Sequence, residues 1–307
     1  MLDTIVGLLA STIIAATPLA LGAYCGIFCE RSGVVNIGIE GMMLTAACIS
    51  QIVAQYSGDL FLALITGVLT GGILAFLHAV ISIRFKAEQI ISGTVINILA
   101  VGLTGHLYQR YLAFGAGAPP SPGTFPKMPI PILKDIPILG PIFFQHQPIV
   151  YAMLVLTFLT HFILFYTPWG LRTRAVGEHP RAADTVGINV YRVRYINVTL
   201  SGLIAGLAGC WFTLEWVGTF NLLMTGGKGF IALAAMIFGK WSPFGSFAAA
   251  VIFGFANALQ INFQLNMPNI PYQFLTMAPY LLTMIVLAGV IGRAIPPAAD
   301  GQPYEKG

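Results

Sequence analysis

Long apolar tracts separated by short polar or basic segments recur along almost the whole chain. At about 20 helical residues, each is long enough to cross the roughly 30 Å hydrocarbon layer of a membrane. They cover residues 5–28, 34–53, 60–83, 90–112, 149–166, 196–217, 244–261 and 272–291. Backbone groups cannot stay unpaired in lipid, and the tracts lack the alternation of barrel strands, so the pattern predicts membrane-spanning helices.

Two interruptions break this pattern. Residues 32–41 place glycines and polar side chains inside an apolar stretch, and Gly-Gly-Lys-Gly occupies residues 226–229. The apolar run at 230–238 that follows is only about half a membrane long at about 1.5 Å per residue. It fits a re-entrant half-helix or, joined to residues 220–224, a broken span.

Discontinuous helices in corresponding halves of a chain often mark transport pathways. The two halves are not visibly alike in sequence, so the sequence suggests an internal repeat only weakly. We expect an all-α polytopic membrane protein with about 8–10 transmembrane helices, one of them broken or re-entrant. Residues 1–307 form a single transmembrane domain in this interpretation.

The composition supports a membrane protein. Hydrophobic residues make up 57% of the chain and charged residues only 8%, which leaves too little polar surface to cover a soluble globule. The four cysteines lie in apolar tracts and lack the spacing of a zinc site. Cys25 and Cys29 share a helix face, which would allow metal binding, but we interpret all four cysteines as small apolar core residues. We therefore expect no bound metal. Nothing resembles a nucleic-acid footprint.

The basic residues are concentrated in one segment. Residues 172–194 hold five of the nine arginines. Within them, Pro180 suits the first position of a short helix and Gly187 suits its end. The positive-inside bias assigns the loop 167–195 to the cytoplasm, and alternation of the spans then puts eleven of the fifteen Lys and Arg on that side. The N-terminus is expected outside and the C-terminus inside.

A proline-rich segment, residues 114–147, falls on the outer side in this scheme. Its prolines disfavour a regular helix and favour an extended path. We expect an external loop or flap, with an inert linker as the alternative.

Polar groups at membrane depth are costly unless they face a cavity or a partner. The candidates for a translocation pathway are Asn36, Glu40, Gln89, Ser92, Thr94, Asn97, Glu215 and Asn221. Asn36 and Glu40 share a helix face if that stretch is helical. Amides and hydroxyls suit a neutral, hydroxyl-rich solute, whereas the alternative is that these groups hold helices together.

The chain lacks the GxxxxGK[ST] phosphate loop, since Trp241 follows Gly239-Lys240. Energy for transport must therefore come from an ion gradient or from another subunit. An ion-coupled secondary transporter would use Glu40 or Glu215 as its coupling acid. A membrane-embedded enzyme finds no support, because no nucleophile–base pair or metal cluster is apparent.

Three segments resemble a known family. Residues 174–184 (RAVGEHPRAAD) with Gly187-Ile188 resemble the cytoplasmic coupling loop of ABC importer permeases of the ribose, branched-chain amino acid and nucleoside group. Residues 30–44 (ERSGVVNIGIEGMML) look like the signature of the nucleoside or simple-sugar branch. Residues 227–245 are also similar.

The resemblance implies a permease subunit in the bacterial cytoplasmic membrane that imports nucleosides or related sugars by alternating access. Its partners would be a second permease chain, a nucleotide-binding subunit that holds ATP and Mg²⁺, and an extracytoplasmic solute-binding lipoprotein; this chain would hold no cofactor. Residues 178–186 would sit in the ATPase groove. His179 replaces the asparagine common before the proline and is a poorer N-cap. The expected coupling residues are Arg174, Glu178, His179, Pro180, Arg181, Asp184 and Gly187.

Overall fold

A computed structural model describes residues 2–113, 121–266, 277, 281 and 294–306. The regular structure in these residues is helical throughout, and six helices are long and apolar enough to cross a membrane. They are Asp3–Glu30, Leu60–Arg84, Gln89–Leu112, Pro148–Tyr166, Val190–Val217 and Pro243–Gln264. Each corresponds to a predicted tract, although the fifth begins at Val190, before the predicted residue 196. The predicted span at 272–291 lies outside the described residues.

The predicted span at 34–53 is wrong in its first part. Helix α1 (Leu2–Glu30) ends, residues 31–38 continue without regular helix, and α2 (Ile39–Ser57) begins only after them. Gly33 has a φ of +83°, a left-handed conformation that helps the chain leave the helix. Asn36 therefore lies before α2, and the expectation that it shares a helix face with Glu40 does not hold.

The second interruption is a broken span. Helix α9 (Val190–Trp211) continues as the π-helix η4 (Phe212–Val217), and Gly218 ends it with a φ of +76°. The chain then turns back and forms the short helix α10 (Lys228–Phe238). Arg31, at the far end of α1, donates hydrogen bonds to the carbonyl of Trp241, three residues after α10. Residues 218–241 therefore cross the bundle together, which excludes a re-entrant hairpin.

The two interruptions belong to corresponding halves of the bundle. In each, a long helix, an unwound segment, a further helix and a long helix follow in order: α1, α2 and α3 (Leu60–Ala79), then α9, α10 and α11 (Pro243–Asn266). The long helices interlock, with α3 packed along α9 and α11 along α1. The motif Glu-x-x-Gly-x-x-Asn occurs at both breaks, as residues 30–36 and 215–221. This short shared motif is a sequence signal of an internal repeat.

Small residues allow α3 and α9 to pack closely. Gly67 and Gly71 of α3 lie against Gly202 and Gly206 of α9, so that two Gly-x-x-x-Gly pairs face each other. A side chain at Gly71 would collide with the backbone of both α9 glycines. This contact joins the two halves at the centre of the bundle.

Large apolar side chains point outward from the peripheral helices. Ile73 of α3, Ile98 of α4 (Gln89–Leu107) and Phe158 of α6 (Pro148–Tyr166) are each about two-thirds exposed, at 68%, 69% and 65%. Such surfaces require a surrounding apolar phase, which a lipid bilayer supplies.

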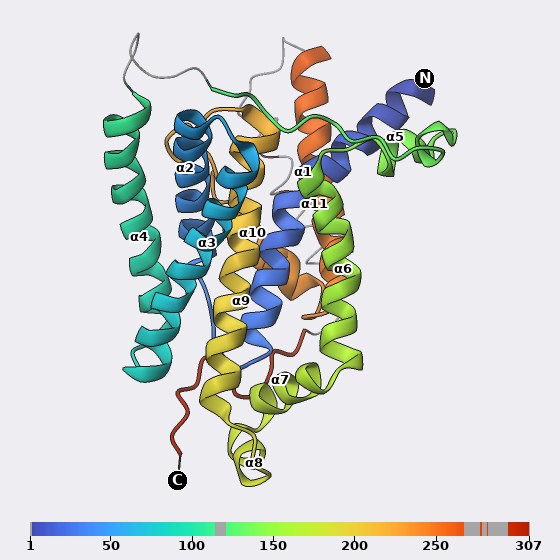
Figure 1. The fold of residues 1–307 in the computed structure, drawn as a ribbon. Helices are drawn as coiled ribbons and strands as arrows, with labels where there is room; N and C mark the ends of the chain where they lie inside the picture. Colours follow the sequence, from blue (N-terminus) through green and yellow to red (C-terminus); the bar gives the residue numbers. More distant parts are fainter. Residues whose placement is uncertain (1, 114–120, 267–276, 278–280, 282–293, 307) are drawn as a thin grey trace.

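The two ends of the bundle differ (Figure 1). One end, here called the basic end, carries α7 (Pro168–Glu178), α8 (Pro180–Thr185) and the C-terminal residues 294–306, called the tail. The start of α1 and the described part of the proline-rich loop lie at the opposite end. That loop contains two short turns, a 3₁₀ turn (Leu133–Asp135) and α5 (Leu139–Phe143), and its Phe125 N–H donates to the Leu214 carbonyl of η4.

Substitution at the central glycine contact tests this packing. We expect Gly71→Val to lower the stability of the folded bundle by about 1–3 kcal/mol, because the added atoms overpack the α3–α9 contact. The matched control is Gly102→Val on α4, where an added Cβ meets nothing within 4 Å. Thermal unfolding in detergent measures both variants, and equal midpoints would contradict the close packing.

Candidate functional site: the broken spans and the basic end

Glu40 joins the two broken spans. Its carboxylate, in the first turn of α2, accepts hydrogen bonds from the Thr225 hydroxyl (2.6 Å) and from the backbone N–H groups of Gly227 (2.8 Å) and Gly229 (2.6 Å). The last two belong to the beginning of α10, where the free N–H groups and the helix dipole favour an anion. Glu40 thus acts as the N-terminal cap of α10, although it lies on another helix.

Polar side chains of α3 and α4 satisfy the unwound backbone after α1. The Gln89 amide oxygen accepts from Val35 N–H (2.7 Å), and the Asn97 amide both accepts from Gly41 N–H (2.8 Å) and donates to the Ile37 carbonyl (3.1 Å). His78 donates from Nε2 to the Val35 carbonyl (2.9 Å).

The remaining candidates near this break make similar contacts. Ser92 pairs with Nδ1 of His78 at 2.9 Å, and the Asn36 side-chain oxygen accepts from Gly38 N–H at 3.0 Å. The Thr94 hydroxyl donates to the Ile90 carbonyl of its own helix. The geometry of Gln89, Ser92 and Asn97 therefore supports the interpretation that these groups hold separate segments together, whereas the Asn36 bond to Gly38 is local.

Glu215 lies at the opposite break. Its side chain is 4% exposed, and its carboxylate accepts from the Ile149 N–H in the first turn of α6 (2.5 Å). Like Glu40, it is a carboxylate that caps the N-terminus of another helix. Asn221 is exposed, lies in the segment between η4 and α10, and lines a cavity described below.

The short helix at the basic end has the predicted boundaries. Helix α8 begins with Pro180 at its first position, and Gly187 follows it with a φ of +85°. The His179 side chain makes no capping hydrogen bond. Ala183 is buried against Val176, Val190 and Tyr304, whereas Arg181 is exposed, so α8 is fixed on one face and free on the other.

The other expected coupling residues lie nearby. The Arg174 guanidinium lies over the Phe165 ring, 5.1 Å from its centroid. Asp184 is half-buried, and its carbonyl accepts from Gly187 N–H (2.9 Å) where α8 ends. Glu178 is exposed and accepts a hydrogen bond from the tail.

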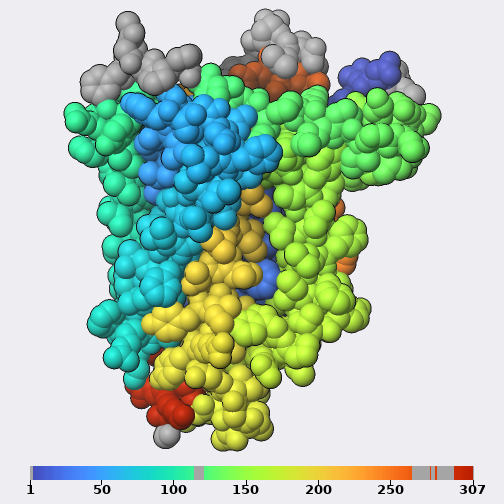
Figure 2. Space-filling model, viewed as in Figure 1, coloured from blue at the N-terminus to red at the C-terminus, as the bar shows by residue number. Residues whose placement is uncertain are grey.

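The tail is a component of the basic end that the sequence did not reveal. The N–H of Ala299 donates to the Gly177 carbonyl (2.9 Å), and the N–H of Ala298 donates to the Glu178 carboxylate (3.2 Å). Figure 2 shows the tail between α8 and the end of α3. A groove of about 680 Å³ lies between the tail and residues 178–182.

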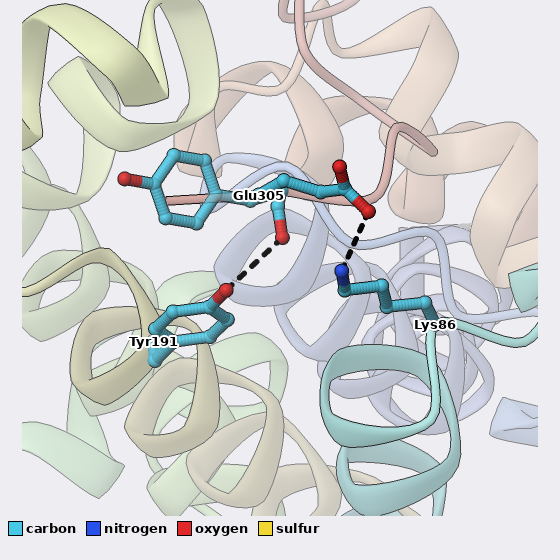
Figure 3. A network of polar contacts seen from close by, with 4 residues as sticks. Lys86, Tyr191 and Glu305 are labelled. Atoms are coloured by element: carbon cyan, nitrogen blue, oxygen red, sulfur yellow. Dashed lines mark hydrogen bonds and ion pairs between the residues drawn. The ribbon is translucent and has the colours of Figure 1, made fainter. Parts of the chain in front are cut away.

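Two further contacts fix the end of the tail (Figure 3). Lys86 forms an ion pair with Glu305 (2.6 Å), and the Tyr191 hydroxyl donates to the Tyr304 carbonyl (3.3 Å). The ion pair is exposed, so it contributes little to stability by itself. The tail nevertheless contacts α7, α8, α9 and the segment between α3 and α4 at the basic end.

A buried carboxyl group lies inside this arrangement. Arg194 donates to the Ser32 carbonyl (3.1 Å) and to the Gln302 carbonyl of the tail (2.9 Å), beside Asp300 and Glu30. Burial raises the pKa of the Asp300 carboxyl to about 7, while Glu30, the Gly301 backbone and Arg194 oppose the rise. The packed tail therefore favours the protonated form of Asp300.

The raised pKa predicts a pH dependence of the tail. A carboxyl group with a raised pKa stabilises the packed tail below its ordinary pKa, and this contribution is lost as the pH rises through the raised value. We expect the Ala299 amide to exchange faster at about pH 8 than at about pH 6, after correction for intrinsic exchange, and Asp300→Asn to reduce the difference. The control is Asp135→Asn, at an exposed position of the opposite end. An unchanged pH dependence in Asp300→Asn would disprove the assignment.

The cap on α10 gives a second prediction. We expect Glu40→Gln to cost about 2 kcal/mol, because the amide loses the charge-assisted hydrogen bonds to the helix N-terminus. Glu88 caps α4 in the same manner through Ile90 and Ile91 but is exposed, so Glu88→Gln is the matched control and should cost less. Thermal unfolding of both variants measures the difference, and equal small losses would contradict a special role of the α10 cap.

Comparison with known proteins identifies the family. Residues 8–293 match the family model described as branched-chain amino acid transport system / permease component. The guanosine ABC transporter permease protein NupQ of Bacillus subtilis is 45% identical over 97% of this chain and 96% of its own length. The nucleoside permease NupC of Lactococcus lactis is 38% identical (99% and 98%), and the putative glucose permease TsgC13 of Haloferax volcanii is 35% identical (94% and 92%). No solved structure matches.

The chain belongs to this permease family and is a multi-pass permease subunit of an ABC importer in the bacterial inner membrane.

Proposed function

We propose that this permease imports nucleosides. The observation that carries the proposal is the 45% identity, over nearly the full length of both chains, to a permease named for guanosine transport. A second relative of similar coverage carries a nucleoside name, and the relative named for glucose is less similar than either. Sugar import is thus the alternative for the cargo.

The hydrogen bonds of Glu40 and Glu215 argue against ion coupling. An ion-coupled carrier needs an acid that binds and releases its ion during the cycle. Glu40 and Glu215 instead accept backbone hydrogen bonds at the N-termini of α10 and α6, which holds them in place. The geometry favours a structural role for Glu40, both of whose carboxylate oxygens are bonded, and for Oε1 of Glu215, whereas Oε2 of Glu215 has no partner among the described residues.

The proposed partners follow from the family and from the two ends of the bundle. We place the basic end in the cytoplasm, where α8 enters a groove of a nucleotide-binding subunit that carries ATP and Mg²⁺. A second permease chain completes the pore, and a solute-binding lipoprotein delivers cargo at the opposite end. The absence of a phosphate-loop sequence supports the assignment of ATP hydrolysis to the partner subunit.

The coupling role of α8 predicts the effect of a charge reversal. We expect Arg181→Glu to reduce uptake driven by ATP about tenfold in proteoliposomes that contain the whole importer, because it reverses an exposed charge on α8. The control is Arg172→Glu, an equally exposed arginine on α7. Guanosine uptake and ATP hydrolysis are measured in parallel.

Three outcomes are informative. Full uptake in Arg181→Glu would contradict the coupling role of α8. Uptake without ATP that a protonophore abolishes would contradict the ATP-driven mechanism. ATP-driven uptake of glucose but not of guanosine would leave the importer in place and disprove the nucleoside cargo.

A further inference from the structure

A cavity of about 380 Å³ lies in the second half of the bundle and adjoins the Glu40 junction through Lys228 at the start of α10. Its walls come from α9, η4, the segment after Gly218, the start of α10, and α11, with one residue of α1. The volume is within the range of small-molecule sites, about 300–1,000 Å³. The residues that carry the argument are Trp211, Trp216, Asn221, Lys228, Asn257 and Gln260.

The cavity has an aromatic wall built by the π-helix. Trp211 and Trp216 are stacked, with ring centroids 5.2 Å apart and planes inclined by 21°. They are five residues apart, which is the spacing that the hydrogen bonds of a π-helix connect. Trp211 is 2% exposed and Trp216 is 47% exposed, so the outer indole is backed by the inner one and is partly free. A planar ligand can stack on such a surface.

The same cavity presents hydrogen-bonding groups without protein partners. No hydrogen bond joins the Asn221, Asn257 or Gln260 side chain to another residue that the structure describes. Amide groups that line a cavity without protein partners are available to donate to a ligand and to accept from it.

The remaining polar group is a cation. Lys228 lies at the first position of α10, and its ammonium is 5.4 Å from the centroid of the Phe212 ring. An ammonium donates hydrogen bonds to carbonyl oxygens and ring nitrogens, whereas the three amides can both donate and accept. Such a set matches the edge of a nucleobase, which carries donors and acceptors, better than it matches a cationic or a purely apolar solute.

We propose that this cavity is a nucleoside site on the translocation route, in which the base stacks on Trp216 and its edge is read by Asn221, Asn257, Gln260 and Lys228. The inference rests on the proposed nucleoside import and deepens it. The cavity lies beside the break in the second half, and Lys228 at the start of α10 forms part of its wall. A movement of α10 would therefore alter the shape of the cavity. A base presents an aromatic face and a simple sugar does not, so stacking on Trp216 favours a nucleoside over a simple sugar.

The test uses the whole importer in proteoliposomes with guanosine as the probe. We expect Trp216→Ala to lower the guanosine transported per ATP hydrolysed about tenfold, a loss typical of a missing base–aromatic stack. Trp216→Phe keeps an aromatic face and should stay within about threefold of the wild type. Leu222→Ala, at a neighbouring exposed position outside the cavity wall, is the control and should be unchanged.

A second measurement locates the site. Photolabelling with 8-azidoguanosine should modify residues 211–228 or 257–261, and excess guanosine but not glucose should prevent it. Labelling confined to other segments would overturn the proposal, as would wild-type transport in Trp216→Ala or an equal loss in Trp216→Phe. Wild-type protein that fails to import guanosine would overturn the proposed function as well, so the two failures are distinguishable.

Discussion

The structure depends on a single constraint, which is that every backbone polar group at membrane depth needs a partner. Helices meet this requirement by themselves, but the chain leaves the helical conformation twice inside the bundle. At the first break, Gln89, Asn97 and His78 supply the missing hydrogen bonds. At the second, the Glu40 carboxylate binds the free N–H groups of α10. The arrangement of the other helices follows from keeping these groups in contact.

The same constraint divides the polar residues of the spans into two classes. Residues such as Asn97 and Glu215 have backbone partners, and their role is to hold two segments together. The amides around Trp216 lack such partners among the described residues and line a cavity instead. Polarity alone therefore does not distinguish a structural group from a ligand-binding group; the bonding state of each group does.

At the basic end, α8 is fixed to the bundle on one face and is exposed on the other. Buried Ala183 fixes α8 to the bundle, and the tail contacts α7 through Glu178, α9 through Tyr191 and the segment between α3 and α4 through Lys86. In the family to which the chain belongs, this is the end where we place the ATPase subunit.

The sequence by itself determined the elements whose signals are local. Tract length and hydropathy located the six long helices, and Pro180 with Gly187 set the limits of α8, because chain geometry at a helix end depends on neighbouring residues. It could not determine where α2 begins, which partner Glu40 binds, or how the tail returns to α8. These depend on contacts between residues far apart in the chain, such as Glu40 with Gly229 or Ala299 with Gly177, and only the tertiary structure brings those groups together.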